Sequence, residues 1–241
     1  MKCSDNQASW LDTDDLNDKA EVYYDDDNLC DSYSCLKQIS DRGSTPPHIR
    51  FNQGLIFSKK AREDPTLYSI AQKIFSEVLE SPLYRLDCLH ALGNISLLSE
   101  DHELAIPTYR IAIESDPTFK PAYEGLIAGF CSLKVFEEAD QAYSEGITNC
   151  DGGLEAGLFN MALAATLEKD RVRSKKCFDA CLNSLDDLSE ALSAHNLDHY
   201  FEKPDFEGFF EYVSKDPEGR SLPLFLRTPA WKPRESFGSS D

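Results

Sequence analysis

The chain has 241 residues, of which 41% are hydrophobic and 28% are charged, and its formal net charge is −19. So negative a charge argues against nucleic acid as a main partner, because neutralising phosphates requires a basic surface and the pairs Lys59-Lys60 and Lys175-Lys176 stand isolated. No apolar run reaches the roughly 18 to 20 residues that a membrane span requires, so we expect no membrane insertion.

The N-terminal residues and the cysteines both favour the cytosol. Five aspartates fall within residues 1–20, where a signal or transit peptide would be basic or apolar. The chain has eight cysteines. Four of them, Cys88, Cys131, Cys177 and Cys181, fall within predicted helices without an export signal, which favours small buried thiols over disulfides. We therefore expect a cytoplasmic protein.

Residues 1–45 form an acidic segment that we expect to be disordered. They contain four basic and eleven acidic side chains and are rich in Asp, Ser and Asn. Apolar residues such as Trp10, Leu16 and Leu29 are spaced among the acids. Two interpretations stay open: a solvating acidic tail, or a short motif that folds on a partner.

A helical repeat is predicted over residues 46–200, and its first pair of helices is expected at about 47 to 81. Asp64-Pro65 favours a break between these two helices, since proline disfavours helix at the residue before it and is tolerated at a helix start. The break lies within an extended turn expected over residues 60–66.

The repeat is clearest over residues 86–117, where large and small apolar residues recur on two predicted helices. Small residues let neighbouring helices approach closely, and large ones fill the gaps between them. Two imperfect copies follow at intervals of about 34 residues, with bulky Ile127 in the position of Gly93 and Asp151 in place of the closing proline. The three copies consist of Leu89, Leu92, Gly93, Ala105, Tyr109, Ala112 and Pro117; of Tyr123, Leu126, Phe130, Ala139, Tyr143 and Gly146; and of Leu158, Met161, Ala162, Ala165, Ser174, Phe178 and Cys181.

This pattern resembles the tetratricopeptide repeat family, for which a period near 34 residues with two helices per copy is typical. The resemblance implies an all-α fold: an α-solenoid of about four tetratricopeptide-like helix pairs with a C-terminal capping helix and flexible termini. It also implies a habit of binding peptides or proteins. It supplies no catalytic chemistry.

The chain after the repeats is expected to close the stack. A capping helix is predicted at residues 186–194. Residues 201–241 are expected to hold a docking helix, with Phe206, Phe209 and Phe210 packed on the last repeat, and a proline-rich tail. The prolines favour an extended backbone in the apolar segment 221–231. This segment is suited either to docking along the chain's own surface or to reaching a partner.

A partner-binding groove is expected where the resemblance places the first helix of each pair, on the concave face. Its apolar residues suit an apolar helix or an extended peptide, and Asp87 lies on the same face. The alternative is that some of these side chains pack between repeats. The predicted groove residues are Phe51, Leu55, His90, Asn94, Leu97, Glu124, Phe159, Asn160 and Leu163.

The groove lacks the cage of lysine, arginine and asparagine with which such repeats clamp a peptide's C-terminal carboxylate. The matching positions hold His90, Gly125, Ala156 and Asn160, with no Lys or Arg among them. We therefore expect no carboxylate-clamp chaperone binding.

No motif indicates an enzyme. The chain lacks a phosphate-cradling GxGxxG or GxxxxGK motif and a GxSxG nucleophile turn. His195 and His199 are four residues apart, as a zinc pair on one helix face would require, with Asp198 or Glu202 as a third ligand, but they lack the HExxH order. We expect no metal and no cofactor, and a small metal-dependent enzyme at His195 and His199 is the weakest alternative.

The sequence therefore predicts a non-enzymatic adaptor or scaffold that binds a protein or peptide segment in its concave groove. The main alternative is a self-inhibited structural subunit of a larger complex, in which one of the chain's own tails occupies the groove until a partner displaces it.

Overall fold

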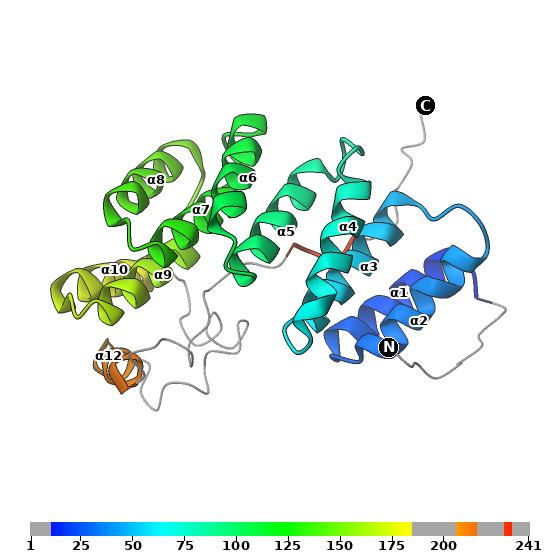
Figure 1. The fold of residues 1–241 in the computed structure, drawn as a ribbon, viewed down its shortest axis with the longest axis horizontal. Coiled ribbons are helices and arrows are strands. Elements are labelled where there is room, and N and C mark those ends of the chain that lie inside the picture. Colours follow the sequence, from blue (N-terminus) through cyan, green and yellow to red (C-terminus); the bar gives the residue numbers. More distant parts are fainter. Residues whose placement is uncertain (1–10, 185–205, 216–228, 233–241) are drawn as a thin grey trace. The chain divides into compact units, whose positions relative to one another are not determined.

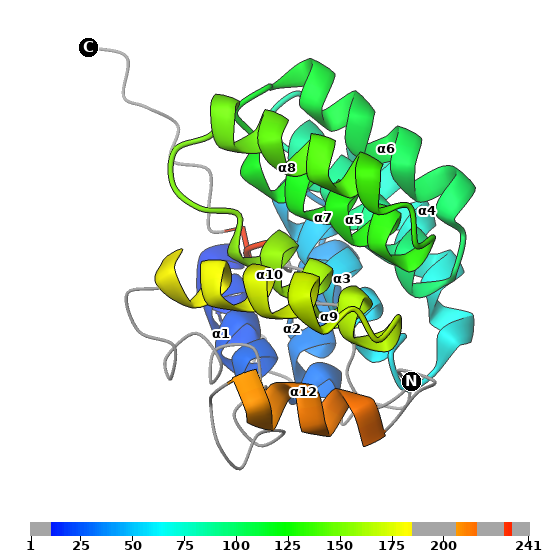
Figure 2. The ribbon, with the colours of Figure 1, turned by 90° about the vertical axis from the view of Figure 1, so that its left-hand side faces the viewer.

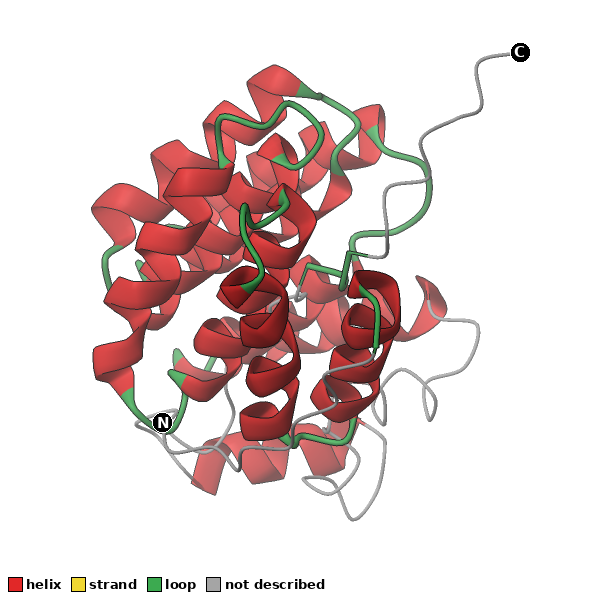
Figure 3. Ribbon diagram, turned by 90° about the vertical axis from the view of Figure 1, so that its right-hand side faces the viewer, coloured by secondary structure: helices red, strands yellow, loops and turns green. Residues whose placement is uncertain are grey.

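A computed structural model describes residues 11–184, 206–215 and 229–232 of this protein (Figure 1). These residues form eleven α-helices and one 3-10 helix. Figure 3 shows helices and connecting loops, with no strand in this part of the chain. The expected all-α architecture of paired helices is confirmed. The chain divides into two compact units, one of Met1–Ser99 with Thr228–Asp241 and one of Glu100–Arg227.

The part of the first unit that the structure describes has five α-helices, each packed on the next one along the chain. Short connections join α1 to α2 and α3 to α4, so the two helices of each pair run antiparallel. The elements are α1 (Thr13–Asp25), α2 (Leu29–Asp41), α3 (Pro47–Lys60), the 3-10 helix η1 (Pro65–Leu67), α4 (Tyr68–Val78) and α5 (Arg85–Leu98).

The helices α1 and α2 correct the expectation that residues 1–45 are disordered. Leu16 and Leu36 are fully buried in the core of the first unit, and the Ser32 hydroxyl donates a hydrogen bond to the carbonyl of Ala20 at 2.8 Å. The acidic side chains of these helices lie at exposed or half-buried positions. Composition misled the prediction because the acids occupy one side of an amphipathic pair whose apolar side has a partner.

The turn between α1 and α2 has the backbone conformation of the turns within later helix pairs, so these two helices are built like those pairs. Asp27, Lys134 and Lys169 lie in the turns α1–α2, α7–α8 and α9–α10, and each has a φ near the left-handed region, at 60°, 60° and 62°. A residue in this conformation is a common way to end a helix. The chain thus carries one more helix pair, ahead of the four that were expected.

The break expected around Asp64-Pro65 separates α3 from α4. Asp64 Oδ1 accepts hydrogen bonds from the Thr66 amide at 3.2 Å and from the Thr66 hydroxyl at 2.6 Å, which holds the turn before α4. Within the pair, Gly54 of α3 lies so close to α4 that a Cβ there would come within 2.7 Å of the Phe75 ring. The absence of a side chain at Gly54 therefore sets how closely the two helices approach.

The described residues of the second unit form six α-helices. In this unit α6 packs on α7, α7 packs on α8 and α9, α9 packs on α10, and α12 lies against α9 and α10 (Figure 2). The helices are α6 (His102–Ser115), α7 (Lys120–Ser132), α8 (Phe136–Asn149), α9 (Glu155–Leu167), α10 (Arg171–Ser184) and α12 (Phe206–Lys215). None of the described helices of either unit is long and apolar enough to cross a membrane.

Close helix contacts in the second unit explain how an imperfect repeat packs. Gly125 of α7 lies under the buried Tyr109 of α6, where a Cβ would come within 2.3 Å of the ring. Ile127, the bulky residue in the position of Gly93, faces Gly157 of α9, whose added Cβ would lie 2.8 Å from Ile127 Cδ1. A large residue on one helix is thus matched by a glycine on its neighbour.

We expect Leu36→Ala to lower the free energy of unfolding by about 2–5 kcal/mol, because it empties a fully buried position between α2 and its neighbours. Urea denaturation followed by circular dichroism measures this. Val22→Ala on α1 is the control, since Val22 is 60% exposed and its loss should change little. Equal stability of the Leu36→Ala chain and the unsubstituted chain would contradict the packing of α2.

Candidate functional site

A short non-helical segment, Pro229–Lys232, lies against the helices of the first unit, as the red trace in Figure 1 shows. It is far from these helices in the sequence. Its contacts reach α1, α3 and α5. A binding face was predicted on α3 and α5 but not on α1, so the segment lies partly on the predicted face and partly on a helix that the prediction lacked.

Asn52 of α3 binds both main-chain groups of Lys232. Its Nδ2 donates to the Lys232 carbonyl at 2.9 Å, and its Oδ1 accepts from the Lys232 amide at 2.9 Å. Asn52 itself is fully buried and also donates to Asn17 Oδ1 of α1 at 3.0 Å. Both distances to Lys232 are those of good hydrogen bonds. The side-chain amide of Asn52 therefore forms hydrogen bonds with both the N–H and the C=O group of one residue of a non-helical chain. These bonds do not involve that residue's side chain.

The polar partners of Lys232 recur at the interval of the repeat. Asn17 and Asn52 are separated by 35 positions, and Asp87 follows Asn52 at the same interval. Asn17 Nδ2 adds a longer hydrogen bond to the Lys232 carbonyl, at 3.4 Å. Equivalent positions on α1, α3 and α5 thus face a single residue of the bound segment.

The side chain of Lys232 enters an acidic and aromatic environment. Its Nζ lies 2.6 Å from Asp87 Oδ2 and 5.4 Å from the centre of the Phe51 ring. The side chains of Lys232 and Asp87 are only 19% and 25% exposed. Partial burial reduces screening by water, so this pair interacts more strongly than an ordinary surface ion pair.

Trp231 packs into the same unit as an apolar anchor. It is 9% exposed, belongs to the core cluster of the first unit, and lies 5.1 Å from the Tyr24 ring at an interplanar angle of 42°. Lys59 fixes Tyr24, since its Nζ donates to the Tyr24 carbonyl at 2.9 Å and lies 4.6 Å from the ring centre. Burial raises the pKa of Tyr24 to about 12, so the ring stays a neutral phenol at physiological pH.

The indole N–H of Trp231 is buried and has no hydrogen-bond acceptor in the described part of the chain. The contact with Tyr24 therefore depends on the apolar ring and not on the nitrogen.

The predicted groove residues of the first unit are all buried. Of these, Phe51 contacts the bound segment through Lys232. Asn94 Nδ2 lies 3.3 Å from His90 Nε2, so these two side chains meet each other along α5. Their role in binding a partner stays a prediction. The five residues are Phe51, Leu55, His90, Asn94 and Leu97.

In the second unit the predicted groove residues are also buried. Glu124 of α7 accepts a hydrogen bond from the Ala156 amide at 3.2 Å, which places a carboxylate at the first turn of α9, where amides lack helical partners. Phe159 meets the ring of Phe209 of α12 edge to face at 5.6 Å. Binding of a partner by these residues stays a prediction as well. The set is Glu124, Phe159, Asn160 and Leu163.

Helix α12 covers α9 and α10 with its aromatic side chains. Phe209 is fully buried and stacks on Phe178 at 4.7 Å, in addition to its contact with Phe159. At the edge of this cluster, Arg171 forms an ion pair with Glu207 and lies 4.5 Å from the Phe210 ring centre. Helix α12 thus covers the side chain of Phe159, which is one of the predicted groove residues.

The residues of the predicted metal alternative lie in a part of the chain that the structure does not describe. They are His195, His199, Asp198 and Glu202, and the predicted capping helix at 186–194 also lies outside the described residues. No group of three or more His, Cys, Asp or Glu side chains in the described ranges is placed to hold a metal ion.

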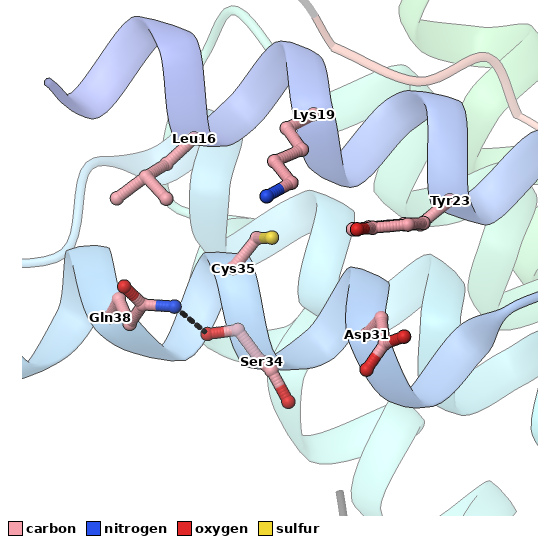
Figure 4. A pocket seen from close by; sticks show the side chains of 7 residues that line it. All are labelled: Leu16, Lys19, Tyr23, Asp31, Ser34, Cys35 and Gln38. Atoms are coloured by element: carbon pink, nitrogen blue, oxygen red, sulfur yellow. Dashed lines mark hydrogen bonds between the residues drawn. The ribbon is translucent and has the colours of Figure 1, made fainter. Parts of the chain in front are cut away.

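A shallow pocket opens between α1 and α2 (Figure 4). The Lys19 ammonium points toward the Cys35 thiol, and Gln38 donates to the Ser34 carbonyl at 3.4 Å. Burial raises the pKa of Cys35, so this thiol is not an activated nucleophile. The lining residues are Leu16, Lys19, Tyr23, Asp31, Ser34, Cys35 and Gln38.

Asn17 and Asn52 were missing from the predicted site. The signal that could have found them is the 35-residue interval that links them to each other and to Asp87. Because the composition of residues 1–45 predicts disorder, the predicted repeat does not reach Asn17, and Asn52 is not among the predicted groove residues.

No family model and no curated protein matches the chain. Among solved structures it is similar to YrrB, described as a TPR protein with an unusual peptide-binding site, with 18% sequence identity and a TM-score of 0.48 over 77% of this chain and 93% of that one. The assignment to paired-helix repeats rests on the chain's own helices and contacts.

Burial raises the pKa of Cys88, Cys131 and Cys181 to about 12 in each case. We therefore expect these thiols to resist iodoacetamide at pH 8 in the folded chain and to react after unfolding, where the thiol pKa returns to roughly 8.5. Mass spectrometry of alkylated peptides measures this. Modification of Cys131 in the folded chain at pH 8 would contradict the packing described here.

The same shifts give a pH dependence. A thiol whose pKa is higher in the folded state contributes stability that is fully present below about pH 8.5 and is lost as the pH rises toward 12. Thermal melts at increasing alkaline pH should therefore show a falling melting temperature.

Proposed function

We propose that this chain is a non-enzymatic protein-interaction scaffold that binds an extended segment of a partner protein across α1, α3 and α5. The observation that supports this most directly is the contact of Asn52 with both the amide and the carbonyl of Lys232. The surface already holds a piece of non-helical chain through its backbone, which is the common element of any peptide ligand.

Main-chain recognition makes chemical sense at this position. A peptide that enters a partly buried surface must replace the water on its N–H and C=O groups, and each group left unpaired costs about 1–3 kcal/mol. One asparagine side chain offers a donor and an acceptor in the right spacing to avoid both losses. Asn17 orients that side chain by accepting a hydrogen bond from the same Nδ2 atom at 3.0 Å.

The proposed binding surface shares Phe51 with the predicted groove but is centred on Asn52. Phe51 remains as a contact, because its ring lies beside the Lys232 ammonium. The other predicted residues of the first unit are buried in the fold. The cytosol is the compartment that we propose, because the described cysteines are free thiols, six of them buried, which suits a reducing environment.

The test compares two neighbouring buried amides of α3. Asn52→Ala removes the main-chain contacts, whereas Gln53→Ala removes hydrogen bonds to α2, including one from Nε2 to the Ser40 hydroxyl at 2.9 Å. Both substitutions are made in a full-length chain that also carries Trp231→Ala and Lys232→Glu, so that the chain's own segment does not compete with a partner for Asn52. Each chain is used to capture partners from an extract of its native cells, and circular dichroism verifies that each is folded.

We expect partners captured by the chain with Trp231→Ala and Lys232→Glu alone to be retained when Gln53→Ala is added and reduced about tenfold when Asn52→Ala is added, as the loss of roughly 1.4 kcal/mol would produce. Equal capture by all three chains would refute the proposed surface. Equal loss in both variants would show that only general stability was affected, and would also count against it.

A further inference from the structure

The segment held by the first unit has a definite chemistry: an aromatic residue followed directly by a cation. We propose that this surface recognises partner segments with an aromatic–lysine or aromatic–arginine pair, and that Trp231-Lys232 is the chain's own copy of that ligand, which occupies the site until such a partner displaces it. The inference rests on the proposed function and adds the partner's chemistry and the resting occupant.

The segment is bound as a ligand would be. Asn52 and Asn17 contact its backbone, Asp87 contacts its charge and Tyr24 contacts its ring, and these four residues come from three different helices. A segment that merely filled a gap in the core would need only apolar burial. Here one residue, Lys232, is read through its amide, its carbonyl and its ammonium.

The sequence around the pair favours the bound conformation. Lys232 is followed by Pro233, and the residue before a proline is restricted to extended backbone. The residue that Asn52 holds is therefore disfavoured from helical backbone before it binds, in agreement with its non-helical conformation here, and this restriction lowers the entropy lost on docking.

The charge selectivity comes from Asp87. A glutamate in place of Lys232 would set two partly buried carboxylates against each other where the present distance is 2.6 Å between opposite charges. The Phe51 ring adds a cation–π contact at 5.4 Å, which favours a cation and offers nothing to an anion. The net charge of −19 further raises the rate at which basic segments arrive.

The aromatic selectivity comes from Tyr24 and the surrounding core. Because the Trp231 indole N–H has no acceptor in the described residues, a phenylalanine could replace the tryptophan without losing a hydrogen bond. The site thus requires a large flat ring and not specifically tryptophan.

Covalent attachment explains why the chain's own copy is bound at rest. A tethered segment experiences an effective concentration in the millimolar range, so a free peptide of equal intrinsic affinity competes poorly. A partner must therefore make more contacts than Trp231-Lys232 does, or present several copies of the pair. The tail thus sets the affinity that a partner must exceed in order to bind.

The experiment uses full-length chains and two fluorescent capped peptides. One peptide has the sequence of residues 228–234, Thr-Pro-Ala-Trp-Lys-Pro-Arg, and the other has Glu in place of its Lys. The site is vacated in the chain by Trp231→Ala with Lys232→Glu. Fluorescence anisotropy gives the affinity of each peptide, and thermal melts verify that every chain is folded.

We expect the vacated chain to bind the lysine peptide at least about tenfold more tightly than the unsubstituted chain does, because the tethered competitor is gone. Adding Asp87→Lys should reverse the preference, weakening the lysine peptide and strengthening the glutamate peptide. Asp18→Lys is the matched control: it makes the same change in net charge at an exposed position of α1 and should leave the preference unchanged.

Three results would overturn the inference: equal binding of both peptides by the vacated chain, binding of neither by a vacated chain that melts normally, or a concentration-dependent dimer of the unsubstituted chain that dissociates when Lys232 is replaced. The last would mean that the tail docks on a second copy. The proposed function is judged separately by the comparison of Asn52 with Gln53, which does not depend on the peptide's sequence.

Discussion

Each helix that the structure describes depends on a neighbour to cover the apolar side that it cannot bury alone. The contacts show how tightly this constraint acts: Tyr109 lies against Gly125, and Ile127 lies against Gly157, with no room for an additional Cβ. A stack built this way is stable wherever a neighbour is present. It also leaves apolar surface wherever a neighbour is missing, and in both units a C-terminal segment covers such surface.

The two C-terminal segments do this by different chemistry. In the second unit, α12 places Phe209 against Phe159 and Phe178, which is core packing between helices. In the first unit, Trp231-Lys232 adds a backbone clamp and an ion pair to its apolar anchor. Only the contacts of Trp231-Lys232 in the first unit have the features of peptide recognition. For that reason we place the partner-binding function in the first unit and regard α12 of the second unit as part of the fold.

The period of the apolar residues was sufficient to predict the all-α fold and the helix pairs from residue 47 onward, because helix packing repeats small and large residues at fixed intervals. It failed at α1 and α2, where eleven acids over residues 1–45 outweighed a few apolar positions such as Leu16 and Leu36. Burial depends on which face those residues share, and composition carries no information about faces.

The site was harder to predict than the fold. Phe51 was anticipated from its place on a first helix, but Asn52, the adjacent residue, makes the decisive contacts. Its partner is a segment 180 positions away, and no local pattern in the sequence joins the two. The general possibility that a tail docks on the chain was foreseen, whereas the register in which Lys232 meets Asn52 and Asp87 required three-dimensional contacts.

The most direct test of this account is the hydrogen exchange of the Lys232 amide, measured by NMR in the full-length chain. That amide donates to Asn52 Oδ1 at 2.9 Å, so we predict slow exchange in the unsubstituted chain and fast exchange after Asn52→Ala, with the amides of α3 still protected in both. If Lys232 exchanges at the rate of an unstructured peptide while α3 remains protected, the first unit does not hold its own tail and the account is wrong.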